Sequence, residues 1–165
     1  LNEKKIDVKN FICENIYTHL LIFSHSFPII LILFLFSDFK FQLSLFFVFI
    51  GLFLVLINLI LLGYLIATMS AIYKDVKRIV ENLMYALFFA TPIIWSENMV
   101  SAKIQKLLVF NPFYNFIILF RNPLMNNIDE TFYISFFVCL LLMVIIFLIN
   151  LKINKYLENK IILYL

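Results

Sequence analysis

The sequence predicts an all-α integral membrane protein, organised as one membrane domain over residues 1–165. Hydrophobic residues make up 64% of the 165 positions, charged residues only 14%, and 21 residues are phenylalanine. Soluble domains are about 45–50% apolar and about 25% charged, and a chain of this size leaves much of its surface exposed. This apolar excess therefore excludes a soluble monomer, and it equally excludes an intrinsically disordered chain.

Charged residues are so rare that their positions divide the chain into apolar segments. A helix crosses the bilayer core with about 20 apolar residues, and four segments have that character. The second is longer than one span needs, but no turn signal interrupts it, so one tilted helix fits it better than two antiparallel spans. The four predicted transmembrane helices lie near residues 18–37, 42–72, 79–96 and 131–151.

The stretch between the last two spans, residues 97–130, is unusually apolar for a loop. Residues 103–110 are amphipathic, Asn111-Pro112 interrupts them, and residues 113–120 are almost wholly apolar. Pieces this short do not span a bilayer and are typical of re-entrant or interfacial segments. We expect two short helices joined at Asn111-Pro112 that dip back into the outer leaflet; the alternative is an amphipathic helix lying on the membrane surface.

The distribution of the 13 basic residues predicts the orientation. Nine of them precede the first span, separate the second from the third, or follow the fourth. Because cytoplasmic loops carry the excess of Lys and Arg, both termini and the loop at residues 74–78 are expected in the cytoplasm. The basic residues form no continuous stripe, so nucleic-acid binding is not predicted.

Two local features stand at the ends of the third span. Pro92 removes a backbone donor, so the helix is expected to kink or end near residues 90–91, with Trp95 in the interfacial aromatic belt. A simple kink and a gate hinge both remain open. At the other end, a short turn carries Lys74, Asp75, Lys77 and Arg78. This turn is either only exposed to solvent or bound by a cytosolic partner.

Other chemistry is missing from the sequence. With two glycines, Gly51 and Gly63, no phosphate-binding loop can form. His19 and His25 do not share a helix face, so a zinc site is not expected. Hydrolase spacings are also lacking. We therefore predict no catalytic residue, metal or cofactor. Four polar residues of the second span are expected to hydrogen-bond between helices and not to form a transport site: Ser44, Asn58, Thr68 and Ser70.

Four short elements, in this order and spacing, resemble the permease subunit of bacterial type-2 ABC exporters, and most closely the branch that exports O-antigen and other cell-surface polysaccharides. They are residues 72–80 (IYKDVKRIV), residues 90–95 (ATPIIW), Asn111-Pro112 and residues 121–124 (RNPL).

The resemblance implies an architecture and a set of partners. Such permeases are six-span, multi-pass proteins of the bacterial inner membrane. This chain would then be an N-terminally truncated fragment that holds the last four of the six spans. It implies a homodimer of permeases with separate ABC ATPase subunits that hydrolyse ATP. The cargo would be a lipid-linked, O-antigen-like glycan of the kind found in lipopolysaccharide, moved among membrane lipids.

The resemblance also implies residue roles. The ATPase-coupling turn would be Lys74, Asp75, Lys77 and Arg78. The gate and re-entrant elements would contain Pro92, Trp95, Asn111, Pro112, Arg121 and Pro123. Because aromatic faces stack on sugars, a glycan path could include Tyr64, Tyr85, Phe88 and Tyr114, although each of these side chains could equally face lipid or pack between helices. Two other functions remain open: a type-2 permease for a drug, lipid or teichoic-acid-like polymer, and a non-transporting membrane anchor.

Overall fold

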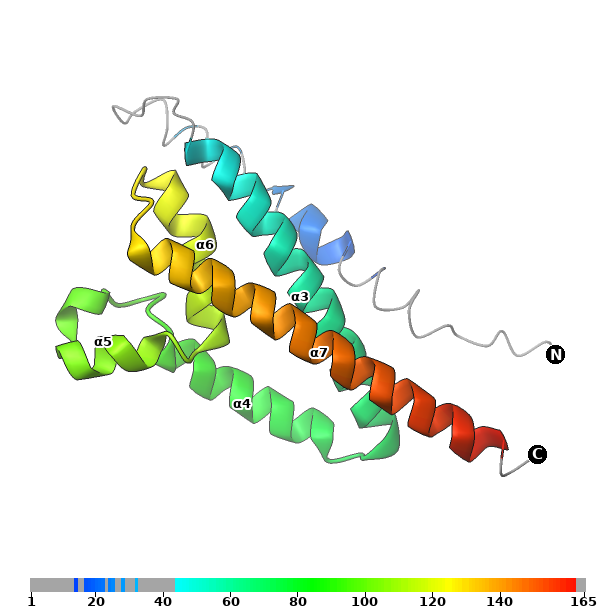
Figure 1. Cartoon of the computed structure of the whole chain (residues 1–165). Helices are drawn as coiled ribbons and strands as arrows, with labels where there is room; N and C mark the ends of the chain where they lie inside the picture. Colours follow the sequence, from blue (N-terminus) through cyan, green and yellow to red (C-terminus); the bar gives the residue numbers. More distant parts are fainter. Residues whose placement is uncertain are drawn as a thin grey trace. The chain divides into compact units, whose positions relative to one another are not determined.

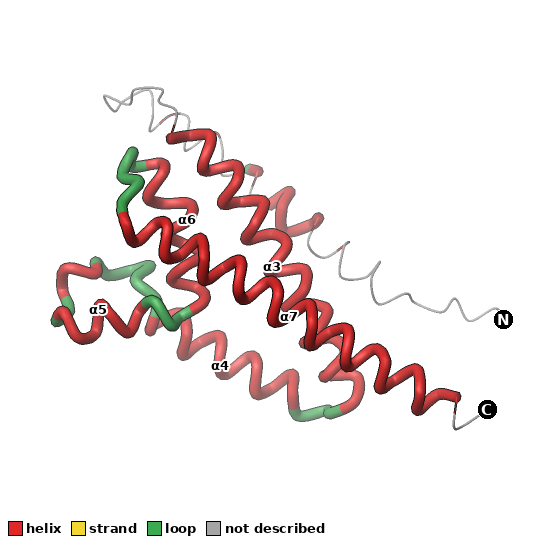
Figure 2. The backbone as a smooth tube through the Cα atoms, viewed as in Figure 1, coloured by secondary structure: helices red, strands yellow, loops and turns green. Residues whose placement is uncertain are grey.

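The structure is a computed structural model of the chain. It describes residues 14, 17–22, 24, 25, 28, 32 and 44–162, with side chains up to residue 155. The described residues form helices, turns and loops and include no strand (Figure 2). The chain divides into two compact units, Leu1–Gln42 and Leu43–Leu165. Much of the predicted span 18–37 lies outside the described residues, so the fold that follows is that of the second unit.

Three helices form the packed part of this unit: α3 (Ser44–Ile72), α6 (Pro112–Leu124) and α7 (Glu130–Ile162) (Figure 1). Between α3 and α7 the chain passes through α4 (Val76–Ala90), the short 3₁₀ helix η1 (Glu97–Met99) and α5 (Ala102–Leu108). Side chains from all three packed helices meet in one hydrophobic core. Its buried members are Leu54, Phe116, Leu119, Phe132 and Cys139.

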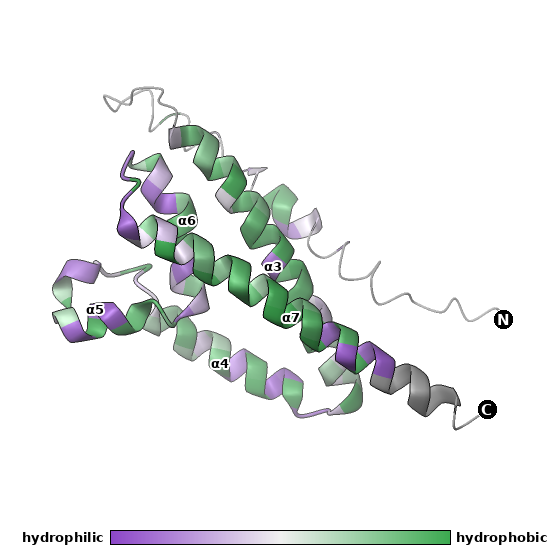
Figure 3. Ribbon diagram, in the orientation of Figure 1, coloured by the Kyte–Doolittle hydropathy of each residue, from purple (hydrophilic) through white to green (hydrophobic). Residues whose placement is uncertain are grey.

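Two helices are long and apolar enough to cross a membrane, α3 and the segment Glu130–Lys155 of α7 (Figure 3). They match the second and fourth predicted spans. Only 17% and 22% of their most apolar windows are buried within the protein, whereas the core helix of a soluble domain is mostly buried. Large exposed apolar surfaces mark contacts with a membrane or a partner, so these two helices favour a membrane protein.

The predicted third span is shorter than expected. α4 has 15 residues and ends at Ala90, where Pro92 predicts a helix end. At 1.5 Å per residue its length is about 22 Å, less than the roughly 30 Å of the hydrocarbon core. With the first predicted span largely outside the described residues, the structure does not confirm the predicted total of four transmembrane helices.

Polar side chains join α3 to α7 along one seam. Asn58 Nδ2 donates to the Cys139 carbonyl oxygen at 3.2 Å, Asn150 Nδ2 to the Leu61 carbonyl oxygen at 3.0 Å, and the Tyr64 hydroxyl to Asn154 Oδ1 at 2.8 Å. The predicted interhelical role of Asn58 is confirmed, whereas the Thr68 hydroxyl donates within α3, to the Tyr64 carbonyl oxygen at 2.8 Å. Interhelical hydrogen bonds in membranes contribute about 0.6 kcal/mol each on average, so this seam mainly fixes how the two helices are paired.

The backbones of α3 and α6 lie close together at Gly51. A Cβ atom at this position would lie 2.6 Å from the backbone carbonyl oxygen of Leu119. That carbonyl has no donor four residues further along its own helix, because residue 123 is proline. Gly51 of α3 therefore leaves room for the Leu119 carbonyl of α6, and Pro123 leaves that carbonyl without its helical donor.

Candidate functional site

The end of α4 is closed by side chains instead of backbone groups. Pro92 has no N–H to donate into the last turn. The Thr91 hydroxyl donates to the Leu87 carbonyl oxygen at 2.6 Å, and Trp95 Nε1 donates to the Phe89 carbonyl oxygen at 3.0 Å. The Thr-Pro-Ile-Ile-Trp sequence thus supplies side-chain donors to two carbonyls in the last turn of α4, and it holds the indole ring of Trp95 against the helix end.

Asn111 connects this helix end to the start of α6. Its Nδ2 donates to the Thr91 hydroxyl at 2.9 Å across 20 residues of sequence. Its Oδ1 accepts from the Phe113 backbone N–H at 3.0 Å, which caps α6, and Pro112 occupies the first turn. α5 ends at Leu108 and α6 begins at Pro112, so two short helices meet at Asn111-Pro112. That they dip into the outer leaflet stays a prediction. The fold therefore brings together the Thr91-Pro92 and Asn111-Pro112 elements.

Glu97 forms the polar centre of the neighbouring surface. Its carboxylate pairs with Arg121 through Oε1 and accepts a hydrogen bond from the Tyr114 hydroxyl through Oε2 at 2.9 Å. Gln105 Nε2 also donates to the Glu97 carbonyl oxygen at 2.9 Å. Burial and the hydrogen bond to Glu97 raise the pKa of Tyr114, so its hydroxyl stays a proton donor. The carboxylate thereby ties η1 to α6, and the Glu97 backbone carbonyl ties η1 to α5.

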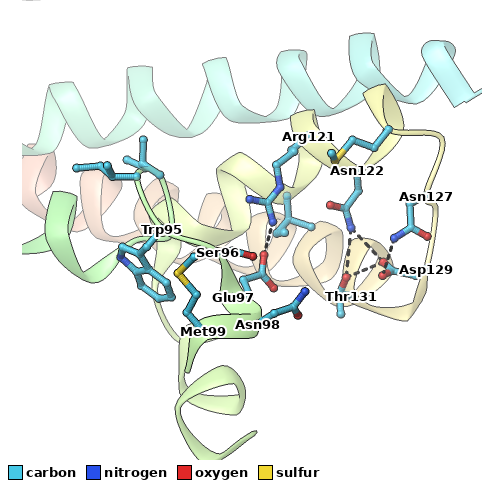
Figure 4. Close-up of a pocket in the computed structure, with 14 residues that line it drawn as sticks. Trp95, Ser96, Glu97, Asn98, Met99, Arg121, Asn122, Asn127, Asp129 and Thr131 are labelled. Carbon is cyan, nitrogen blue, oxygen red and sulfur yellow. Dashed lines mark hydrogen bonds and ion pairs between the residues drawn. The ribbon is translucent and has the colours of Figure 1, made fainter. Parts of the chain in front are cut away.

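A pocket of about 610 Å³ opens beside the Glu97–Arg121 pair (Figure 4). Loop residues 93–99 form one side, and Ile118, Arg121 and Asn122 of α6 form another. The remaining side comes from the segment between α6 and α7, with Met125, Asn127, Asp129 and Thr131. We call this cavity the Glu97 pocket.

Asp129 organises the side of the pocket nearest α7. Its Oδ1 accepts from the Thr131 hydroxyl at 2.6 Å, from Asn122 Nδ2 at 3.1 Å and from the Phe132 backbone N–H at 3.1 Å. Burial by itself would raise the pKa of the Asp129 carboxyl, but these hydrogen bonds outweigh it and hold the pKa below its ordinary value. The carboxylate stays ionised and caps the first turn of α7.

Replacing Asp129 by alanine is expected to destabilise the start of α7 by about 1 kcal/mol at neutral pH, because a cap acceptor is lost. Because folding lowers the pKa of Asp129, its charge stabilises the folded protein fully above the unfolded pKa of about 3.9. This stabilisation is lost as the pH falls through the folded pKa. Amide hydrogen exchange in the first turn of α7 measures this. Asp129→Asn, which keeps an acceptor oxygen, should lose less; equal losses would contradict the capping role.

Glu97→Ala and Tyr114→Phe are each expected to lower the free energy of unfolding by about 1.5–3 kcal/mol, since a hydrogen bond to a charged group is lost. The double variant should lose less than the sum, because both changes remove the same bond. Thermal unfolding in nanodiscs measures all three. Tyr133→Phe, at an exposed tyrosine of α7, serves as the control. Strictly additive losses would show that the two residues do not act together.

The other predicted residues lie away from this pocket. Lys74, Asp75, Lys77 and Arg78 are exposed at the opposite end of α4, about 22 Å along its axis. The aromatic residues proposed for a glycan path do not converge. Tyr64 lies in the seam with α7, Tyr85 and Phe88 are exposed on α4, and Tyr114 is buried beside Glu97. Their common role stays a prediction.

Sequence reasoning missed Glu97 and Asp129. Neither belongs to a recognisable short motif, and Glu97 finds Arg121 only across 24 residues of sequence. The available signal was their scarcity: carboxylates in a stretch this apolar need a partner or water, and Arg121 is the cation that lies within the apolar part of the same stretch.

No family model matches the chain. Two curated proteins do, both O-antigen export system permease proteins RfbA of Klebsiella pneumoniae. One is 26% identical over 74 residues, which is 45% of this chain and 29% of the relative. The other is 28% identical over 69 residues, 42% of this chain and 27% of the relative. The matched stretches thus span less than a third of either relative.

Proposed function

We propose that this chain, a distant relative of O-antigen export permeases over part of its length, belongs to the membrane-spanning permease subunit of an ABC exporter. The subunit moves a lipid-linked, O-antigen-like polysaccharide across the bacterial inner membrane. The observation that carries the proposal is the sequence match to two permeases named for O-antigen export. ATP is hydrolysed by a separate ATPase subunit, and the permease works as a homodimer.

Two structural features support a permease. α3 and α7 present long apolar surfaces that a soluble protein would bury, as expected for helices in contact with lipid or with a second permease. In addition, Thr91 and Trp95 donate to carbonyls at the end of α4 and Asn111 donates to Thr91, so these three residues cluster at this helix end. We assign the gate to this cluster and the helices it joins, together with Pro92, Pro112, Arg121 and Pro123.

The proposed orientation places the exposed turn at residues 74–78 in the cytoplasm, where the ATPase binds. Both termini lie on the same side, because nine of the 13 basic residues belong there under the positive-inside rule. The Glu97 pocket, at the other end of α4, then faces the outer side of the membrane.

Deleting the gene tests the cargo. We expect surface polysaccharide to disappear and lipid-linked polymer to accumulate inside the cell, with both restored by the complete gene on a plasmid. Polysaccharide gels of whole cells and extraction of the lipid-linked polymer measure the two pools. Normal surface polysaccharide in the deletion strain would contradict this cargo, and a changed drug, lipid or teichoic-acid-like pool would identify the alternative.

A further inference from the structure

The Glu97 pocket has the size of a small-molecule site. Its volume of about 610 Å³ falls within the range of about 300–1,000 Å³ that is usual for ligand pockets. It is built by the loop after α4, by α6 and by the segment before α7. These segments are fixed to one another by the bonds of Glu97 and Asp129, so the pocket walls are preorganised.

Its lining combines one aromatic end with one hydroxyl- and amide-rich end. Trp95 and Met99 lie at one end, and Asn127, Asp129 and Thr131 at the other (Figure 4). The indole N–H of Trp95 is already used by the end of α4, and the ring packs against the cluster of Leu108, Tyr114 and Ile118. The ring is thus held in place, and the part that stays exposed lines the pocket. Apolar C–H faces together with many hydroxyls are the chemistry of a pyranose.

Asn98 supplies polar groups that are free for a ligand. It lines the pocket and is exposed, and within the described residues its side chain has no hydrogen-bond partner. An amide offers two donors and an acceptor, which suits sugar hydroxyls because each hydroxyl both donates and accepts. Asn98 lies on η1, next to Glu97 in sequence.

The charges of the pocket argue against an acidic ligand. Two carboxylates, Glu97 and Asp129, line it, but only one guanidinium, and Arg121 is already paired with Glu97. A phosphate or uronic acid would meet a net negative surface. A cation is not required either, because each carboxylate is satisfied by hydrogen bonds or by Arg121.

We propose that the Glu97 pocket binds a neutral pyranose unit of the exported glycan and rejects phosphate and uronic acid groups. Trp95 packs against the C–H face of the sugar, and Asn98 binds its hydroxyls. This inference rests on the proposed function, and it gives the outer side of the permease a selectivity for uncharged sugar units.

Tryptophan fluorescence of the full-length protein in nanodiscs tests the proposal, because Trp95 is the one tryptophan among these 165 residues. The probes are methyl gluco-, galacto-, manno- and rhamnopyranosides, methyl glucuronide, inorganic pyrophosphate and choline. We expect a saturable change with at least one neutral glycoside, and isothermal titration calorimetry, which does not depend on the indole, should show that Trp95→Phe weakens binding of that glycoside. Asn98→Ala should weaken the affinity at least tenfold, and Lys103→Ala, on nearby α5 but outside the pocket, should not.

A second variant tests the charge argument by a gain of binding. Glu97→Gln releases Arg121 and removes one negative charge, so methyl glucuronide should bind this variant at least tenfold more tightly than the unchanged protein. Unchanged glucuronide affinity would contradict the proposed role of Glu97.

Three results would overturn the pocket assignment: no saturable change with any neutral glycoside, tighter binding of pyrophosphate or choline, or neutral binding that Asn98→Ala leaves intact. The deletion experiment separates this outcome from failure of the proposed function. Export that depends on the gene, combined with any of these three results, refutes the pocket alone.

Discussion

Gly51→Ala is expected to lower the free energy of unfolding by about 1–3 kcal/mol, because an extra methyl group in a tight contact forces the backbone apart. The added Cβ would lie 2.6 Å from the Leu119 carbonyl oxygen and 3.2 Å from the Leu119 Cβ. A backbone oxygen cannot rotate away as the end of a flexible side chain can. The substitution must therefore separate α3 from α6 or tilt them.

Gly63→Ala is the matched control, because Gly63 lies in the same helix and is half-buried. In a helix, alanine is normally favoured over glycine by about 1 kcal/mol, so this variant is expected to be neutral or slightly more stable. Thermal unfolding of both variants in detergent, followed by circular dichroism, measures the difference. Equal stability of the two variants would show that α3 and α6 do not meet closely at Gly51.

The structural reason for this contact joins two residues that the sequence alone leaves unrelated. Pro123 belongs to the Arg-Asn-Pro-Leu element that resembles the exporter family, and its missing N–H leaves the Leu119 carbonyl without a helical donor. That free carbonyl lies against Gly51 of another helix. Local chemistry predicts the missing donor, but only the fold shows which helix approaches it.

The features that the sequence predicted well are those set by local backbone chemistry. Pro92 ends α4 at Ala90, and Asn111-Pro112 caps the start of α6. Each depends on a proline or a capping side chain acting within a few residues. The long apolar helices α3 and α7 could also be predicted, since an unbroken apolar run of about 20 residues indicates a membrane-spanning helix.

The features that it missed depend on residues far apart in the chain. The Glu97–Arg121 pair and the Asn150–Leu61 hydrogen bond join segments separated by 24 and 89 residues. Hydrophobic periodicity carries no information about such pairs. The apolar run of the predicted third span continues to Trp95, whereas the helix stops at Ala90, as Pro92 predicts. Composition alone therefore overestimates the length of this helix.

Reversing the charges of the turn between α3 and α4, with Asp75→Lys and Arg78→Glu, is expected to abolish co-purification of the ATPase subunit and to stop export. Both side chains are exposed. Asp75 makes no side-chain cap hydrogen bond to α4, so the change leaves the helix start intact. Losing a charge pair across an interface costs about 2–5 kcal/mol, which corresponds to at least a tenfold loss of affinity.

The conservative pair Asp75→Glu and Arg78→Lys keeps both charges and is the matched control. Affinity purification of the tagged permease from membranes, with the ATPase quantified by immunoblot, measures the effect, and unfolding of both variants shows whether the permease itself is intact. We expect the conservative variant to retain the ATPase. If the reversed variant is folded and also retains the ATPase, the turn is not the contact. If the unchanged protein captures no ATPase either, the membrane-anchor interpretation is favoured over the permease. Because only the order of charges changes and the net charge does not, a loss confined to the reversed variant reports specific pairing with the ATPase instead of general attraction to the membrane surface.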